Sequence, residues 1–455
     1  MLRDRRGLTV TANSPAAVAR LDATVAAFAG HRAETGALLA ETLAADPDLL
    51  LAHCLRGFSS KLLARQEFDR DAEAALALAR VALRRSGATP REARYIAALD
   101  AWCGGDMQRS AKILETIARD HPLDLLGVKL HHAVNFMLGD LQAMRETALA
   151  VTPHWQEDSV PDAGFVLGCL AFALEESGDY TRAETAGTEA CALNPADAWA
   201  THAVAHVFLM RGEPQAGLAW LTRNEANLAG CNNFAYHVAW HEALFHLELG
   251  APDAALDLYD RRVRAVETDD FRDIANAASL LWRLERIGVQ VGDRWDELAT
   301  KAAARVGDLS LVFARLHDLL ALAGAGRIAT AEMMLRSMRL HASRQPGTQS
   351  RTLGEVGLTL GTAIIAAQRG RHGQVVDLLF PVRDRIRRIG GSHAQREIFL
   401  QCLTDAAIRT GRHGEAAILL DERLRQRPQD TGAARQRSEL GRGGEIGAPA
   451  SSLQA

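Results

Sequence analysis

Histidines are the residues of this chain whose type and spacing could do chemistry. His202 and His206 lie four residues apart, and His237 and His241 repeat that spacing further along. Side chains at positions i and i+4 of a helix lie on one face, one turn apart. Two such pairs on neighbouring helices could bind a divalent metal through imidazole nitrogens, or serve as general acid and base near neutral pH.

Carboxylates that could complete a metal site lie near these pairs in the sequence. Glu175, Glu242 and Asp273 are the candidates. The pattern is not the His-Glu-x-x-His of zincin metalloproteases, because Glu242 follows the second histidine of its pair, His241. Three interpretations stay open: histidines that hydrogen-bond inside a packed core, a metal-free site for a polar ligand or peptide, and a metal or acid–base catalytic site. For the last, the candidate residues are His202, His206, His237 and His241, with Glu175 as a further catalytic candidate.

Helices are the elements that must position these side chains. Ala, Leu, Arg and Glu recur throughout, and runs of β-branched residues with period-two alternation are almost absent. Helical stretches of about 12 to 18 residues alternate with short breaks rich in Gly, Asp and Asn. Breaks this short join antiparallel neighbours, so the chain should consist of helical hairpins.

The breaks recur with a period that identifies the kind of repeat. Gly105 and Gly139 are 34 residues apart, and Gly178 is followed by Ala183 after five residues and by Pro195 after seventeen. A turn glycine, a small residue and a helix-ending proline at these offsets are typical of tetratricopeptide repeats. The pattern predicts an all-α, tetratricopeptide-like solenoid of helical hairpins wound as a right-handed superhelix.

The repeat register also predicts which side chains share the inner groove. In tetratricopeptide repeats, positions 2, 5 and 9 of the first helix line the concave surface, and His202, His206, His237 and several aromatic residues fall there. The candidate ligand-binding residues are Phe165, Phe172, Glu175, Trp199, His202, His206, His237, Trp240, His241 and Trp282.

A second motif near the C-terminus offers fewer possibilities. Ser392 follows a Gly-Gly pair and should cap the helix that begins after it, although such a helix start with His393 and Arg396 could also hold an anion. The arginine-rich run 383–388 is more typical of a solvated helix face than of a nucleic-acid site.

Composition limits the classes of function. The 455 residues carry 52 Lys+Arg and 56 Asp+Glu, a net charge of −4 that indicates neither nucleic acid nor an anionic membrane as partner. The start MLRDRRGLTV has no apolar signal region, and the six cysteines form no C-x-x-C pair. We therefore expect a cytoplasmic protein that makes no membrane contact and could form homo-oligomers. We expect residues 1–13 to be an N-terminal extension, 14–430 a single solenoid, and 431–455 a disordered tail.

The order of motifs along the chain resembles the tetratricopeptide repeat protein 38 family from about residue 20 to 425. The motifs are Pro161–Phe172 with Glu175, Gly178–Tyr180, Asn194-Pro195, Asp197–Trp199, His202–His206, Gly212, His237, Trp240-His241, Leu258–Asp260, Ser279–Glu285, Arg294-Trp295 and Gly390–Arg396. The resemblance implies an all-α repeat fold and a soluble protein, and it brings no established catalytic residues. The chain departs from the family pattern at Leu316–Asp318, where Asp-Leu-Leu follows His317 in place of small and Met residues.

Three functions are compatible with these observations. The first is binding of a small ligand or peptide in a concave pocket lined by His and Trp. The second is a hydrolase whose histidine cluster holds a metal or acts as acid and base. The third is a protein-interaction scaffold, which open grooves with Lys or Arg clamps would favour. The only cofactor that the sequence suggests is a divalent metal at the histidines.

Overall fold

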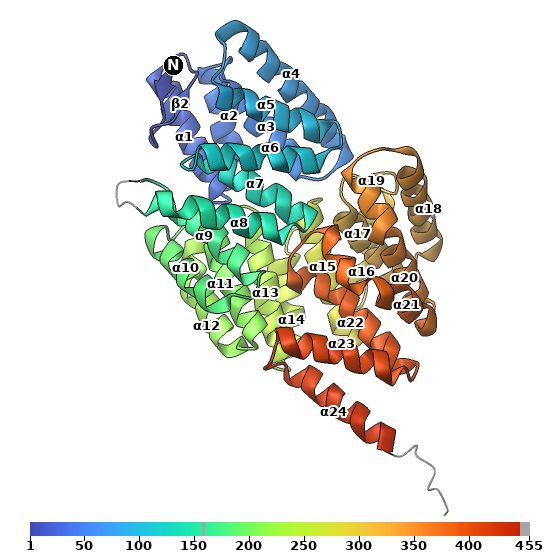
Figure 1. Ribbon diagram of the computed structural model, residues 1–455. Helices are drawn as coiled ribbons and strands as arrows, with labels where there is room; N and C mark the ends of the chain where they lie inside the picture. The colour runs from blue at the N-terminus through green and yellow to red at the C-terminus, as the bar shows by residue number, and fades with distance from the viewer. Residues whose placement is uncertain (157–159, 446–455) are drawn as a thin grey trace, which may run out of the picture.

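The protein is an all-α solenoid of helical hairpins, as the sequence predicts (Figure 1). The computed structural model describes residues 1–156 and 160–445. The α-helices are α1 (Pro15–Ala29), α2 (Thr35–Ala45), α3 (Leu50–Leu62), α4 (Asp69–Ser86), α5 (Pro90–Cys103), α6 (Met107–Asp120), α7 (Leu125–Leu138), α8 (Leu141–Val151), α9 (Ala163–Glu175), α10 (Tyr180–Leu193), α11 (Ala198–Arg211), α12 (Pro214–Arg223), α13 (Phe234–Glu248), α14 (Pro252–Leu258), α15 (Phe271–Arg286), α16 (Arg294–Ala303), α17 (Val312–Gly324), α18 (Ile328–Arg344), α19 (Thr348–Thr352), α20 (Leu358–Gln368), α21 (His372–Leu379), α22 (His393–Arg409), α23 (His413–Gln426) and α24 (Thr431–Glu445).

Short elements interrupt this series. Two strands pair as an antiparallel ribbon at the N-terminus, and short 3₁₀ and π-helical turns extend or follow several helices. They are β1 (Leu2–Arg3), β2 (Thr9–Val10), η1 (Gln66–Phe68), η2 (Thr152–Trp155), η3 (Glu225–Leu228), η4 (Tyr259–Val263), η5 (Leu353–Gly357) and η6 (Phe380–Ile389).

The predicted hairpins are present, and glycines form their turns. Helix α9 packs on α10, α11 on α12, and α13 on α14. The turn residues Gly105, Gly139, Gly178, Gly212 and Gly250 all have φ between 67° and 84°. Only glycine adopts this left-handed region without strain, which is why the repeat period could be read from glycine positions.

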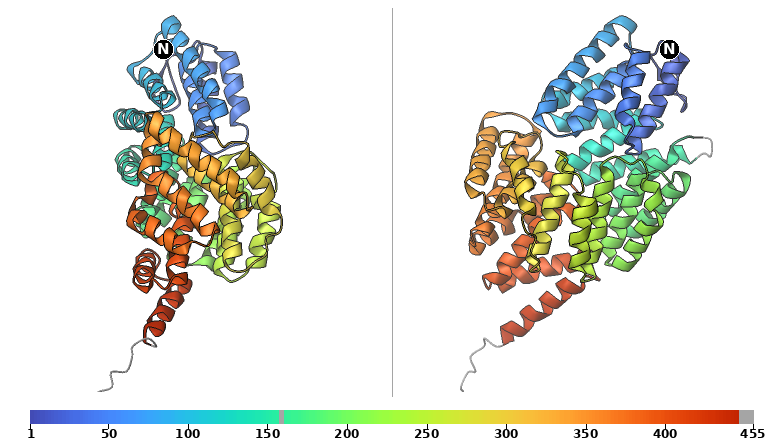
Figure 2. Two further views of the ribbon diagram at one scale, coloured as in Figure 1. Left: turned by 90° about the vertical axis from the view of Figure 1, so that its right-hand side faces the viewer. Right: turned by 180° about the vertical axis from the view of Figure 1, so that it is seen from behind.

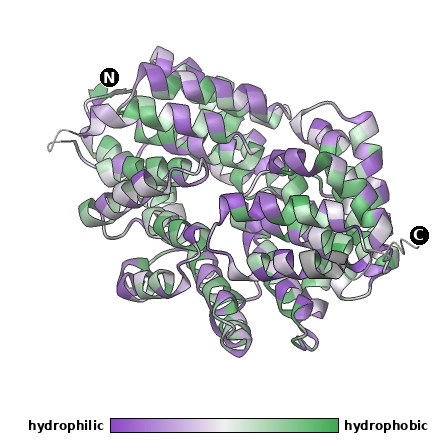
Figure 3. Ribbon diagram, turned by 60° about the horizontal axis from the view of Figure 1, so that its bottom comes forward, coloured by the Kyte–Doolittle hydropathy of each residue, from purple (hydrophilic) through white to green (hydrophobic). Residues whose placement is uncertain are grey.

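Each helix buries an apolar face, and small residues bring paired helices close together. Hydrophobic and hydrophilic residues alternate around the helices (Figure 3). In α10, Ala183 and Ala190 are fully buried, and a Cβ added at Gly187 would lie 2.5 Å from the Val204 side chain of α11. The α10–α11 contact is therefore too close for a larger residue at that position.

The solenoid winds tightly enough that distant segments touch. The Asn232 amide donates to the carbonyl of His31 over 2.8 Å, which joins the turn after α1 to the segment before α13. The Gly391 amide donates to the Phe136 carbonyl over 3.3 Å, and α15 packs on α22, so the C-terminal helices lie against the middle of the chain (Figure 2). Consequently other segments of the chain cover the inner face where the candidate residues lie.

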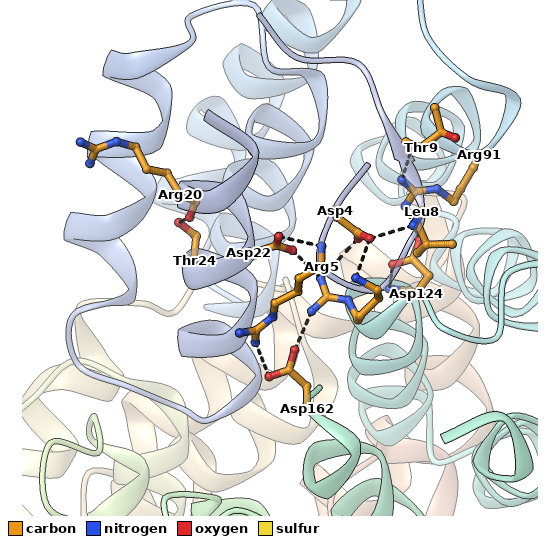
Figure 4. Close-up of polar contacts among 12 residues, drawn as sticks. Asp4, Arg5, Leu8, Thr9, Arg20, Asp22, Thr24, Arg91, Asp124 and Asp162 are labelled. Atoms are coloured by element: carbon orange, nitrogen blue, oxygen red, sulfur yellow. Dashed lines mark hydrogen bonds and ion pairs between the residues drawn. The ribbon is translucent and has the colours of Figure 1, made fainter. Parts of the chain in front are cut away.

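The N-terminal extension is tied to the solenoid by buried ion pairs (Figure 4). Arg6 bonds Asp22 of α1 over 3.0 Å and Asp162, next to α9, over 2.6 Å. Arg91 of α5 pairs with Asp124 over 2.5 Å and donates to the Thr9 carbonyl over 2.9 Å. These contacts hold the β1–β2 ribbon against α1, α5 and the start of α9.

The expectation of a disordered tail from residue 431 is wrong for residues 431–445, which form α24. The Asp430 carboxylate accepts the Ala433 amide over 2.9 Å and so caps the helix start, and Arg437 bonds Asp421 of α23 over 2.8 Å. Low apolar content predicted disorder, but these local polar contacts and the burial of Ala433 stabilise a helix. Residues 446–455 lie outside the described part of the chain.

None of the helices described in the structure combines the length and apolar character needed to cross a membrane.

Candidate functional site

The structure brings the two histidine pairs together, and we call His202, His206, His237 and His241 the histidine cluster. Helix α11 begins at the Asp197 cap, whose carboxylate accepts the Trp199 amide over 3.0 Å, and it presents His202 and His206 to the neighbouring helix α13. All four residues offer a ring nitrogen within 4.8 Å of the others. The rings of His206 and His241 are 4.3 Å apart, centre to centre, and those of His202 and His237 are 4.7 Å apart.

One hydrogen bond joins the pairs directly. The Nε2 atoms of His202 and His237 are 2.9 Å apart, so one ring donates to the other. The Nδ1 of His237 lies 3.1 Å from the Oδ1 of Asn276 in α15, to which it donates. With its proton on Nδ1, His237 keeps a free electron pair on Nε2, directed into the cluster.

A buried carboxylate completes the group. Glu175, at the end of α9, places an oxygen 3.5 Å from the Nδ1 of His206, and both side chains are completely buried. Glu175, Glu176 and His206 form a second group of potential metal ligands, because each offers one ligand atom within 4.8 Å of the other two.

Most polar atoms of this site have no hydrogen-bond partner among the described residues. They are the Nδ1 of His202, both ring nitrogens of His206 and of His241, and both carboxylate oxygens of Glu175. A buried polar atom without a partner costs free energy, so native proteins nearly always satisfy such atoms. At this site the atoms without a partner are donors and acceptors that a bound group could satisfy.

Burial controls the charge of the site. It lowers the pKa of His237 to about 3 and, together with the neighbouring imidazoles, holds the pKa values of His202 and His241 well below the ordinary value. Burial raises the pKa of Glu175, against the opposing effect of His206. His202, His237 and His241 are therefore neutral near pH 7. A neutral imidazole is the form that binds a metal.

Aromatic rings enclose one side of the cluster. Phe172 and Trp199 are 4.7 Å apart, and the Phe172 ring stacks on His202 at 5.6 Å. Trp240 stacks on His237 at 5.3 Å and donates its indole N–H to Ser279 over 3.1 Å. The rings and the burial of the histidines give the cluster an apolar surrounding, in which electrostatic interactions are stronger than in water.

Other candidates named from the sequence lie elsewhere. Phe165 packs against Gly30 at the end of α1, without a ring contact to the cluster. Glu242 pairs with Arg262 over 2.8 Å at the surface. Asp273 accepts from Asn233 over 3.0 Å and, at short range, from Thr268.

Trp282 is also separate, because it lines a hollow of about 320 Å³ between α15, α17, α20 and α22. Trp295 and Phe399 form further walls of this hollow, and Arg286 and Asp405, which pair over 2.6 Å, lie at its edge. The register predicted that Trp282 shares a groove with the histidines, whereas the structure places it in this separate hollow.

The structure adds residues that sequence reasoning did not assign to the site. His31 stacks on Phe234 at 4.6 Å and on Trp199 at 5.7 Å, and His132 meets Trp199 edge-on at 5.4 Å. Asn276 orients His237. His31 lies far from the cluster in sequence and follows a helix end, so no local spacing could reveal it.

The Gly-Gly-Ser motif behaves as the capping prediction requires. The Ser392 hydroxyl accepts the Gln395 amide over 3.4 Å, and the Gln395 side chain accepts the Ser392 amide over 3.1 Å. The same segment holds Glu176, which accepts from the His393 amide over 2.7 Å and from Arg396 over 3.0 Å. This segment thus covers the end of α9, where Glu175 lies.

No protein-family model matches the chain. A solved structure described as "Structure of Naa15/Naa10 bound to HypK-THB" is similar over 97% of this chain and 69% of that chain, with 11% sequence identity and a TM-score of 0.25. Similarity this distant carries no argument about activity or partners, and the fold assignment stands on the helices and turns described above.

Proposed function

We propose that this protein is a metal-binding solenoid that holds one divalent transition-metal ion in the histidine cluster. One observation carries the proposal: four imidazoles with nitrogens within 4.8 Å of one another share a dry core, and most of these nitrogens have no partner among the described residues.

The spacing suits a single ion. Four nitrogens at 2.0–2.1 Å from a tetrahedral zinc lie about 3.4 Å apart. The Nε2 atoms of His202 and His237 are 2.9 Å apart, and no pair of ligand atoms in the set is more than 4.8 Å apart, so the separation needed for one ion lies within this range.

Groups behind the ligands support the same role. A metal-bound histidine usually gives its other N–H to a carboxylate or carbonyl, which fixes the ring's orientation. The Asn276 amide oxygen fills this place behind His237, and Glu175, 3.5 Å from the Nδ1 of His206, lies where it could take the same role. Imidazole without thiolate suits zinc, iron, copper or nickel, and it disfavours calcium and magnesium, which take oxygen ligands.

Burial favours a tightly held ion over an open catalytic one. The four histidines are between 0% and 7% exposed. A hydrolytic metal site must leave one coordination position open to water and substrate. The observation that favours hydrolysis as a second function is Glu175, because its raised pKa makes it a proton donor or acceptor beside the metal.

Metal content tests the proposal. Protein purified without a tag or chelator should contain about one equivalent of zinc, iron, copper or nickel by elemental analysis. The His202→Ala/His241→Ala variant should lose it. The His131→Ala/His317→Ala variant, which removes two buried imidazoles outside the cluster, should retain it.

A spectroscopic measurement on the wild-type protein tests the proposal without any variant, so misfolding of a variant cannot affect it. Stripped wild-type protein titrated with cobalt(II) should show the visible absorption of tetrahedral cobalt, saturating near one equivalent, with competition by zinc. Absence of metal in the purified protein together with a flat cobalt titration would refute the proposal.

We propose small-ligand binding as a separate function of the hollow at Trp282, because its volume of about 320 Å³ and its aromatic walls suit an apolar molecule. An apolar dye whose fluorescence rises on binding should bind the wild-type protein. It should not bind the Ala367→Trp variant, in which the added indole fills the hollow. The Ala342→Trp variant, in α18 and outside the residues that line the hollow, should bind the dye as the wild type does.

The family and location remain part of the proposal. We infer membership of the tetratricopeptide repeat protein 38 family from the ordered motifs between about residues 20 and 425. A cytoplasmic location and a possible homo-oligomeric state are proposed on the sequence alone.

A further inference from the structure

Arginines line a pocket between α18, α20 and α21, away from the histidine cluster. The pocket has a volume of about 300 Å³, and Arg336, Arg339, Arg369 and Arg371 line it. Leu335, Ile365 and Ala366 supply buried apolar surface at its floor. The three helices lie side by side at one edge of the molecule (Figures 1 and 2).

The positive charge of the pocket is largely uncompensated. Arg369 pairs with Glu332 over 2.7 Å. For Arg336, Arg339 and Arg371, no ion pair is found within the described part of the chain, and all three are exposed. The lining therefore has four arginines against one glutamate, in a protein whose net charge is −4.

We propose that this pocket binds an acidic peptide segment of a partner protein. A guanidinium group presents planar donors that match a carboxylate with two parallel hydrogen bonds. Arg336 and Arg339 lie three residues apart on α18 and so face the same side. They can therefore engage neighbouring carboxylates of one peptide.

Exposed apolar side chains on α18 define the partner more closely. Met333 is 48% exposed and Leu340 is 51% exposed, and they lie before and after the two arginines on that helix. The peptide expected here carries Leu or Phe beside its Glu and Asp residues, since arginine pairs give orientation while apolar contacts add affinity.

Duplex nucleic acid is a poorer fit to this surface. It would require a basic surface that follows many phosphates, and the protein has an overall negative charge and a confined pocket. The proposal does not depend on the metal site, which α9, α11 and α13 form, so either can fail without the other.

Fluorescence anisotropy with the full-length protein tests the proposal. The probe is a fluorescein-labelled peptide that alternates Glu pairs with Leu, and the matched probe carries Gln in place of every Glu. The Glu peptide should bind with an affinity that falls as salt rises, and the Gln peptide should bind about tenfold more weakly or not at all.

Matched variants separate the pocket from general electrostatics. Arg336→Gln/Arg339→Gln should weaken binding of the Glu peptide about tenfold or more. Arg145→Gln/Arg223→Gln removes the same charge from exposed positions on α8 and α12 and should leave the affinity nearly unchanged. Circular dichroism is expected to show the same helix content for both variants.

Three results would overturn the proposal. Equal binding of the Glu and Gln peptides would remove the role of charge. Equal weakening by the two double variants would make the attraction non-specific. If inorganic phosphate binds the wild-type protein but not the Arg336→Gln/Arg339→Gln variant, and the Glu peptide binds neither, the pocket is a site for a small anion and not for a peptide.

Discussion

His131 of α7 and His317 of α17 are buried imidazoles outside the histidine cluster, and they make the stability of this protein depend on pH. Burial lowers the pKa of each to about 4. The Nδ1 of His317 donates to the Phe313 carbonyl over 2.8 Å, which favours the charged ring, but burial outweighs this contact and keeps the pKa low. The folded state resists protonation at both positions.

The expected result is a loss of stability in mild acid. Below the ordinary value of 6.5 the unfolded chain binds a proton at each position, whereas the folded chain binds it only near pH 4. Each imidazole therefore contributes stability above pH 6.5 that is lost as the pH falls. The loss is about 1.4 kcal/mol per pH unit, which amounts to about 3 kcal/mol for each imidazole by pH 4.

Urea unfolding at several pH values checks this prediction. His317→Leu should give a shallower fall in the free energy of unfolding between pH 6.5 and 4 than wild type, whatever its stability at neutral pH. His413→Leu, at an exposed position on α23, serves as the control and should leave the slope as it is. A wild-type slope in the His317 variant would contradict the assignment.

Turn glycines at the element scale differ in what surrounds them. Gly178 and Gly139 both have positive φ, but a Cβ at Gly178 meets open space, whereas a Cβ at Gly139 would lie 1.9 Å from the Arg387 carbonyl oxygen of η6. One glycine serves only its hairpin turn, and the other also lets two distant segments touch.

Alanine substitution should separate these roles. We expect Gly178→Ala to cost about 1–2 kcal/mol of unfolding free energy, from backbone strain alone. Gly139→Ala should cost at least about twice as much, since it also forces η6 away from the end of α7. Chemical denaturation of the two variants gives the comparison, and equal losses would show that the α7–η6 contact contributes little.

Closure of the whole solenoid depends on polar contacts between α9 and α22. Arg396 and Glu176 are 220 residues apart in sequence and pair over 3.0 Å, with side chains 6% and 0% exposed. His393 and Arg396 hold the pKa of Glu176 below its usual range despite burial. Without its partners the carboxylate would be a buried charge.

Removing one partner should therefore destabilise the protein strongly. Arg396→Met is expected to cost about 3–5 kcal/mol. Arg286→Met, which breaks the more exposed pair with Asp405, should cost about 0–1 kcal/mol. Adding Glu176→Gln to Arg396→Met should recover part of the loss in urea unfolding. If Arg396→Met and Arg286→Met lose equal amounts of unfolding free energy, the buried pair of Arg396 and Glu176 does not hold the solenoid closed.

Sequence alone determined the local architecture of this protein. Helix composition, turn glycines and the 34-residue spacing predicted the hairpins, because those features act within one or two turns of chain. The i, i+4 spacing predicted that His202 would lie beside His206, and His237 beside His241. The capping role of Ser392 was predictable for the same reason.

Tertiary structure decided the rest, because it depends on how the superhelix winds. Contacts between segments far apart in sequence bring His31 and Asn276 to the cluster, and burial gives the imidazoles their lowered pKa values. The same winding puts Trp282 in a separate hollow. Contacts with α23, among them Arg437 to Asp421, also stabilise the helix at residues 431–445, which composition alone did not predict. Local periodicity fixes which face a side chain occupies, and only the packing of distant turns fixes what that face meets.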